Sequence, residues 1–371
     1  MLSKRERARK QQDRRKEQRE STGHPSFHQS LGRQCRSSNP RRICCSALTP
    51  VSRPVPARRG LCLEEWAASA AVSASAARVR TLPFVRRFRM REVEAATNGF
   101  TTALETAGAA RGTAYRARFA GGLVATVRRA SSGEGQDRGD FYLEVQLLGR
   151  LNHRHVVRLH GFSEGHRDRF LVFDHMENRS LKECLHDPLR TPLDWRTRLQ
   201  VAIDIAAALE YLYYFCDPPV FHVSVNSSNV MMDANFNAKL SDVSVISHDI
   251  KRAITNAESF QGQVEQRRRE LVFQYGVLVL ELVTGQSPGG DGELVRWVQE
   301  PGLAGSMHRM VDADLGGAYD ARELRDLVLV ARLCTRRGDD DDDAGVVSIP
   351  QIVRYLQGKV ERLGRCDNRC G

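Results

Sequence analysis

Two short polar runs near the middle of the chain contain side chains that could do chemistry. Residues 222–229 read HVSVNSSN, and residues 241–244 read SDVS. The hydroxyl of Ser224 is not ionised near neutral pH, so it cannot act as a general base, and losing a positioned base typically costs about 10²- to 10⁴-fold in rate. Asn226 carries no charge. Neither Ser224 nor Asn226 therefore supplies an ionised group of the kind that proton abstraction or charge neutralisation requires.

Together the two runs resemble the protein-kinase signature H-R-D-x-K-x-x-N followed by D-F-G, at the spacing that kinases keep. The resemblance implies that Ser224 stands at the position of the catalytic base and Asn226 at that of the phosphate-neutralising lysine. It also implies that Asn229 and Asp242, which are retained, hold the magnesium positions. Residues 243–244 replace the Phe-Gly that follows this aspartate. We therefore expect a metal corner without a catalytic centre.

The resemblance extends to the nucleotide-binding positions. The glycine-rich loop falls on residues 107–114, where Gly112 is the one glycine of three that remains. Arg128 replaces the phosphate-binding lysine, and a guanidinium is not equivalent to an ammonium at such a site. Its helix partner is Glu144, and the two form either an ion pair that only fixes the small lobe or a remnant of ATP binding. The predicted contacts near the adenine ring are Phe173, Asp174 and Met176. ATP and Mg are thus expected as weak ligands.

Residues that support catalysis in the kinases are replaced as well. Leu271 takes the place of an aspartate that braces the catalytic loop, and Val223 replaces the arginine that pairs with a phosphorylated activation loop. The sequence between Ser244 and Tyr275 contains nothing like G-T-x-x-Y-x-x-P-E, where substrate peptides normally dock. Losses at linked positions indicate a relaxed demand for catalysis.

Hydrophobic periodicity predicts the elements that position these residues. Residues 113–119 and 123–127 alternate as two strands around a tight Gly-Gly turn, which is typical of a hairpin. Residues 144–151 have helical spacing, and residues 170–174 form an apolar strand. After Trp195 the apolar residues recur every three or four positions up to Leu209, which predicts a long amphipathic helix just before the first polar run.

Several ordered blocks carry a resemblance to plant receptor-like Ser/Thr kinases, among them LVFDHMENRSL, PLDWRTRLQVAIDIAAALEYL and SSNVMMD. The resemblance implies an α+β, bilobal protein-kinase fold with a small β-rich N-lobe and a larger helical C-lobe. It predicts four parts: a basic, disordered region at 1–85, an N-lobe with a leading helix at 86–175, a C-lobe at 176–360 and a C-terminal tail at 361–371.

The net charge of +11 is concentrated near the N-terminus, where residues 1–90 contain 21 Lys and Arg against 6 Asp and Glu. Such a segment is interpreted either as a solvated tail or unreliable translation start, or as an arm that contacts an anionic surface such as the inner membrane face. Nothing beside the charge favours nucleic-acid binding. With no secretory or membrane-spanning pattern, the protein is expected inside the cell, in the cytoplasm or at the plasma-membrane periphery.

Three hypotheses for function remain open at this stage. In the first, the chain is a pseudokinase that acts as a signalling scaffold or allosteric partner of other kinases or receptor complexes. In the second, it is an impaired but genuine ATP-dependent Ser/Thr kinase, because positioning and electrostatics supply most of phosphoryl-transfer catalysis. In the third, it is a decayed gene product that folds poorly.

Overall fold

The computed structural model describes residues 85–104, 113–130, 138–166, 168–216, 220, 223–241, 243, 257–289, 292–300, 303–336 and 347–358. All described residues belong to the unit Leu61–Gly371. The predictions for the basic region and for the 361–371 tail therefore fall outside the described residues, apart from Val85.

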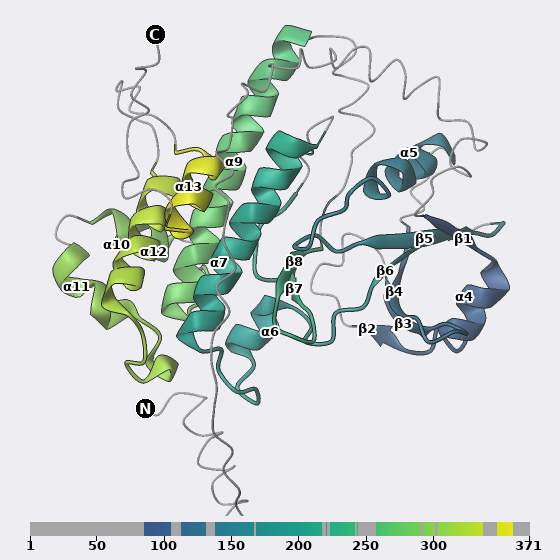
Figure 1. Ribbon diagram of the computed structural model, residues 1–371, viewed down its shortest axis with the longest axis horizontal. Coiled ribbons are helices and arrows are strands. Elements are labelled where there is room, and N and C mark those ends of the chain that lie inside the picture. The colour runs from purple at the N-terminus through teal and green to yellow at the C-terminus, as the bar shows by residue number, and fades with distance from the viewer. Residues whose placement is uncertain are drawn as a thin grey trace, which may run out of the picture. The chain divides into compact units, whose positions relative to one another are not determined.

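A six-stranded sheet forms the N-terminal part of the fold, in the order β1-β5-β6-β4-β3-β2 (Figure 1). Every pairing in it is antiparallel except β1 with β5. The predicted hairpin is confirmed as β3 and β4, with Gly121 and Gly122 at positive φ in its turn. The strands are β1 (Arg86–Phe88), β2 (Ala103–Leu104), β3 (Ala114–Arg118), β4 (Val124–Arg129), β5 (Leu159–Glu164) and β6 (Arg169–Asp174).

The alternation of side chains along β6 divides the apolar residues of this sheet between its two faces. Phe170 and Val172 pack with residues of helix α4 (Met90–Ala96), which is the predicted leading helix. Leu171 and Phe173 belong to the other cluster, with Phe141 and Val145 of helix α5 (Arg138–Leu148). Each face of the sheet is thus covered by one helix.

The larger part of the described chain is helical. Its helices are α6 (Leu181–His186), α7 (Trp195–Glu210), α9 (Ala257–Thr284), α10 (Glu293–Gln299), α11 (Leu303–Met310), α12 (Ala321–Cys334) and α13 (Ile349–Leu356). A π-helical segment, Tyr211–Phe215, extends α7, and a 3₁₀ turn spans Ala313–Leu315. The antiparallel strands β7 (Val230–Met232) and β8 (Ala238–Leu240) complete this lobe. No helix in these described segments is both long and apolar enough to span a membrane.

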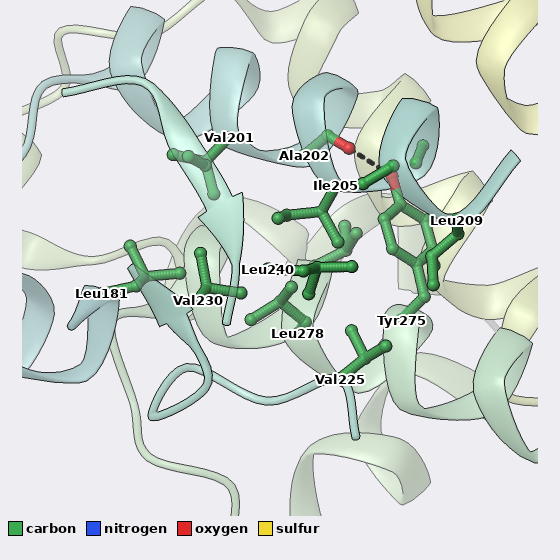
Figure 2. Close-up of a cluster of buried hydrophobic side chains, with 14 of the residues drawn as sticks. Leu181, Val201, Ala202, Ile205, Leu209, Val225, Val230, Leu240, Tyr275 and Leu278 are labelled. Atoms are coloured by element: carbon green, nitrogen blue, oxygen red, sulfur yellow. Dashed lines mark hydrogen bonds between the residues drawn. The ribbon is translucent and has the colours of Figure 1, made fainter. Parts of the chain in front are cut away.

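Helix α7 confirms the predicted amphipathic helix and lies against α9 in the core of this lobe (Figure 2). It begins where the Asp194 carboxylate accepts a hydrogen bond from the Thr197 N–H at 2.8 Å, which caps the helix. The Tyr275 hydroxyl of α9 donates to the Ala202 carbonyl of α7 at 2.9 Å. Buried side chains from four elements meet here: Val201, Ile205, Leu209, Val230, Leu240 and Leu278.

Helix α9 is 28 residues long and starts at Ala257, well before the apolar stretch that contains Tyr275. Its polar first half carries ion pairs at helical spacing, such as Arg267 with Glu270 at 2.9 Å and Arg268 with Glu265 at 2.8 Å. Part of the chain that lacks the usual activation-segment motif is therefore helical. The sequence did not predict this extension.

Candidate functional site

Ser224 and Asn226 lie together in the loop that leads into β7. The Asn226 side-chain amide donates to the Ser224 hydroxyl oxygen at 3.0 Å. The Asn226 amide oxygen accepts from the backbone N–H groups of Ser228 and Asn229, both at 3.0 Å. This loop is therefore closed on itself by neutral groups. An uncharged hydroxyl that is already hydrogen-bonded offers no base for proton abstraction.

Helix α9 holds the same loop at two points on one of its faces. The side-chain oxygen of Gln274 accepts from the Val225 N–H at 2.8 Å, and Glu281, two turns later, accepts from the Ser227 hydroxyl at 2.7 Å. Leu271, at the position of the expected bracing aspartate, is buried. Gln274 thus braces the loop from one turn further along the helix. Sequence reasoning missed this residue, although a spacing of three places it beside Leu271.

Asn229 lies at the expected metal corner. Its side-chain amide donates to the Ser224 carbonyl at 3.2 Å, and its own carbonyl accepts from both the N–H and the hydroxyl of Ser241 at 2.9 Å. Asp242, the second predicted ligand, lies outside the described residues, as does Gly112 of the predicted phosphate loop. An amide oxygen and a carboxylate are oxygen ligands of the kind that magnesium prefers. Asn229 and Asp242 are thus chemically suited to magnesium.

Arg128 of β4 and Glu144 of α5 are brought together, with 3.5 Å between guanidinium and carboxylate. The guanidinium also lies 4.9 Å from the centre of the Phe173 ring, within range of a cation–π interaction. Arg128 therefore contacts two of the other predicted nucleotide-site residues, Glu144 and Phe173. The ion pair was foreseen as an alternative to ATP binding, whereas the ring contact was not.

The last residue of β6 and the residues that follow it are held by contacts with neighbouring strands. The Asp174 carboxylate is 2.5 Å from His160 Nε2 of β5 and 4.0 Å from Lys239 Nζ of β8. Burial opposes the ionisation of Asp174, but the hydrogen bond and charge of His160, together with Lys239, lower its pKa below the ordinary value. Met176 is buried, and Thr126 Oγ1 is 3.1 Å from His175 Nδ1. The predicted adenine-facing segment is thus fixed by polar contacts.

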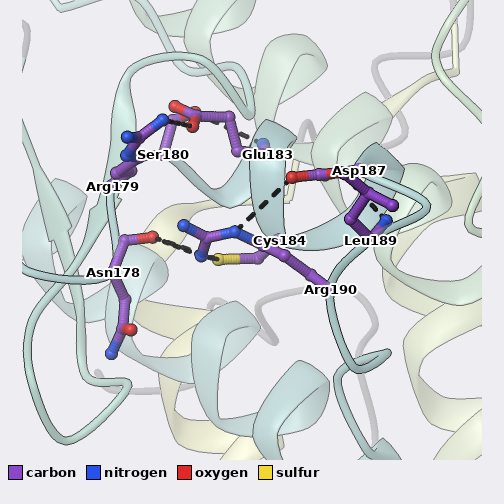
Figure 3. Close-up of polar contacts among 8 residues, drawn as sticks. All are labelled: Asn178, Arg179, Ser180, Glu183, Cys184, Asp187, Leu189 and Arg190. Atoms are coloured by element: carbon purple, nitrogen blue, oxygen red, sulfur yellow. Dashed lines mark hydrogen bonds and ion pairs between the residues drawn. The ribbon is translucent and has the colours of Figure 1, made fainter. Parts of the chain in front are cut away.

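Polar contacts also hold the chain between this segment and α6 (Figure 3). Ser180 caps α6 by accepting from the Glu183 N–H at 3.3 Å, and Arg179 pairs with the Glu183 carboxylate at 3.1 Å. Arg190 and the Cys184 thiol both donate to the Asn178 carbonyl, at 3.1 and 3.4 Å. The start of the helical lobe is therefore anchored locally.

Residues 110–300 match the family described as protein tyrosine and serine/threonine kinase. The chain belongs to this family. It is 37% identical over 290 residues to a probable receptor-like protein kinase of Arabidopsis thaliana, a match that covers 73% of this chain and 43% of that protein. The kinase domain is therefore of the plant receptor-like type, and the chain spans less than half the length of this relative.

Solved structures with the same fold include two pseudokinases. The pseudokinase domain of BIR2, an immune regulator of the RLK/Pelle family, is 25% identical, with a TM-score of 0.59 and coverage of 73% of this chain and 84% of that one. The apo GRMZM2G135359 pseudokinase is 21% identical, with a TM-score of 0.60 and coverage of 74% and 94%. The predicted bilobal kinase fold is confirmed. Members of this family generally bind ATP with magnesium.

Proposed function

We propose that this kinase domain is a pseudokinase, which works as a signalling scaffold or allosteric partner and not by phosphoryl transfer. The observation that carries the proposal is the catalytic loop. Ser224 stands at the position of the base, Asn226 occupies its hydroxyl, and Gln274 of α9 supports the loop without charge. A loop that is well held but uncharged fits a protein that needs the shape of the kinase fold and not its reaction.

Nucleotide binding is proposed to be weak or absent. Arg128 is engaged by Glu144 and lies against Phe173, so its charge is already partly neutralised without a phosphate. The metal positions Asn229 and Asp242 would hold magnesium if ATP binds. Magnesium would then neutralise the phosphate oxygens, which is the chemistry that this ion supplies in kinases.

The proposed partners are other kinases or receptor complexes, and the proposed location is the cytoplasm or the inner face of the plasma membrane. The match to receptor-like kinases supports the first part, as does the shared fold with BIR2, which is itself an immune regulator. The basic N-terminal region, with 21 Lys and Arg in residues 1–90, is proposed to contact anionic lipid.

Thermal unfolding of the full chain with and without ATP, each in magnesium and in EDTA, tests the proposal together with transfer of labelled γ-phosphate. A ligand that binds only the folded state must raise its stability. We expect one cooperative transition, little or no shift with ATP, and no transfer. Transfer that requires magnesium and is abolished by Asp242→Ala would overturn the proposal. A chain without a cooperative transition would instead support decay.

A second candidate function is that of an impaired Ser/Thr kinase. The Arg128–Glu144 ion pair favours it, because active kinases need the corresponding pair in place. Ser224→Asp, Asn226→Lys and Arg128→Lys, combined in one variant, would restore the three missing groups. Measurable phosphoryl transfer by the combined variant would show that the rest of the kinase fold still supports the reaction. If the combined variant folds and still transfers nothing, the second candidate is wrong.

A further inference from the structure

We propose that residues Arg86–Ala96, which form β1 and α4 and are called the clasp below, act as an intramolecular ligand that holds helix α5 in position. The clasp precedes the glycine-rich loop region and adds a parallel strand to the edge of the sheet at β5. Because α5 carries Glu144, the clasp would also control the Arg128–Glu144 pair. The inference is independent of whether the chain binds ATP.

The edge of β5 is shaped to receive this strand. Arg86 is paired with Gly161, where the register of β5 shifts. A Cβ atom at Gly161 would lie 2.0 Å from the Arg86 carbonyl oxygen and 2.7 Å from the Phe88 ring. Both separations are far below van der Waals contact, and one involves backbone that cannot rotate away. Any side chain at position 161 is therefore incompatible with the docked strand.

Apolar contacts anchor the clasp on the face of the sheet opposite α5. Phe88 is buried, and its ring centre is 4.6 Å from that of Phe119. Val93 of α4 is fully buried, and Met90 packs against the same cluster. The clasp is thus bound by hydrophobic burial as well as by strand pairing.

One carboxylate links the clasp to α5. Glu164, at the end of β5, is paired with Arg87 of β1 at 3.5 Å and accepts a hydrogen bond from the Tyr142 hydroxyl of α5 at 2.5 Å. The Glu164 side chain is 6% exposed, and Tyr142 is buried with its ring edge-on to Phe162. Tyr142 lies two residues before Glu144. Displacing β1 would therefore remove Arg87 from Glu164, the carboxylate that also holds α5 through Tyr142.

Hydrogen–deuterium exchange of the full chain tests this coupling, with the peptides that cover 138–148 as the readout of α5. Arg87→Ala removes the link, and Arg86→Ala is its matched control because Arg86 pairs with Glu92 inside the clasp. An ion pair whose cation is solvent-exposed contributes ~0.2–1 kcal/mol, so Arg87→Ala should speed exchange in α5 by about 1.4- to 5-fold. Arg86→Ala should leave it unchanged.

Gly161→Ala should expel β1 and speed exchange both in 86–88 and in α5 by more than Arg87→Ala does. Exchange in β6 (169–174) reports whether the sheet itself stays folded. If Gly161→Ala frees β1 while α5 keeps its protection, the proposal is wrong. Should Gly161→Ala unfold the sheet, Tyr142→Phe decides, because it removes the α5 end of the link and leaves β1 in place. Unchanged α5 exchange in that variant would also overturn the proposal.

Discussion

Two regions of the helical lobe differ in whether they contain charged side chains. In α7, the fully buried Arg198 is paired with Asp312 at 2.7 Å, and its other nitrogens donate to the carbonyls of Leu193 and Leu282 at 3.0 Å. In the predicted catalytic loop, Ser224 and Asn226 are uncharged and are hydrogen-bonded to each other. The first region keeps an ion pair that stabilises the fold, and the second has no charges for the reaction.

This difference separates two explanations for the missing catalytic residues. A chain that decays without any demand on its fold has no reason to keep a buried guanidinium hydrogen-bonded at all three nitrogens while it loses catalytic groups. Nor does decay account for Gln274, which accepts from the Val225 N–H where the expected brace is replaced by Leu271. The contrast therefore supports a fold that is maintained for a purpose other than phosphoryl transfer.

Breaking the buried ion pair should have the largest effect. Arg198→Ala removes the buried positive charge beside the Asp312 carboxylate and the side-chain donor to two carbonyls, which should lower the free energy of unfolding by about 3–5 kcal/mol. Arg196→Ala, on the exposed side of the same helix, is the control and should change it by less than about 0.5 kcal/mol. Urea unfolding measures both. Equal effects would mean that the ion pair does not support the fold.

Placing a charge beside the predicted catalytic loop should also destabilise the protein. Leu271 is 2% exposed, so Leu271→Asp buries a carboxylate and removes apolar contacts, at a cost of about 3 kcal/mol. Gln274 already accepts the hydrogen bond from Val225, so the new carboxylate should not be needed as a brace. Leu271→Met is the volume-matched control. A more stable Leu271→Asp variant would show that the loop still accepts the charged brace.

Removing the neutral brace should have an intermediate effect. Gln274→Met keeps the size of the side chain but leaves the Val225 N–H without its acceptor, which should cost about 1–3 kcal/mol. Glu270→Gln alters the exposed acceptor of the Gln274 side-chain amide, at 3.4 Å, and serves as the control with a change below about 1 kcal/mol. Thermal unfolding of the two variants compares them. Similar midpoints would contradict the bracing role.

Much of the fold could be predicted because it depends on local patterns. The α7 helix follows from its apolar spacing, and the β3–β4 hairpin follows from alternation around Gly121 and Gly122. At the candidate site, the resemblance to the kinase motif predicts Ser224 at the position of the base, and its uncharged hydroxyl cannot serve as one. These features need no knowledge of distant residues.

The features that sequence reasoning missed depend on contacts between distant segments. Gly161 resembles any strand glycine until the Arg86 carbonyl oxygen is placed 2.0 Å from where its Cβ would lie. Arg128 was matched to Glu144 by motif, but its position over Phe173 requires β4 and β6 to be paired. The first half of α9 carries few apolar residues, so its helix is signalled only by charge spacing such as that of Arg267 and Glu270.

Acidification should have the smallest effect, and it introduces charge without mutation. His153 is half-buried, its ring stacks on Tyr211 at 4.8 Å, and its Nδ1 accepts from the His155 N–H at 3.3 Å. Burial, followed by the nearby charges of His155 and Arg154, lowers its pKa from 6.5 to about 4.

Because the folded state resists protonating His153, the unfolded chain takes up the proton first as the pH falls. The contribution of neutral His153 to stability is complete above pH 6.5 and is lost as the pH falls from there towards 4.

His153→Phe keeps an aromatic ring for stacking but cannot titrate. The free energy of unfolding should therefore fall less steeply with acidification in the variant, by about 1 kcal/mol between pH 7 and 4.5, since solvent screens a half-exposed ring. His155, whose charge adds to the lowered pKa of His153, and its partner Asp204 at 3.4 Å are present in both proteins. If the free energy of unfolding falls equally steeply with pH in both proteins, protonation of His153 does not destabilise the fold. The region around His153 would then tolerate an added charge, just as the predicted catalytic loop tolerates the loss of charge.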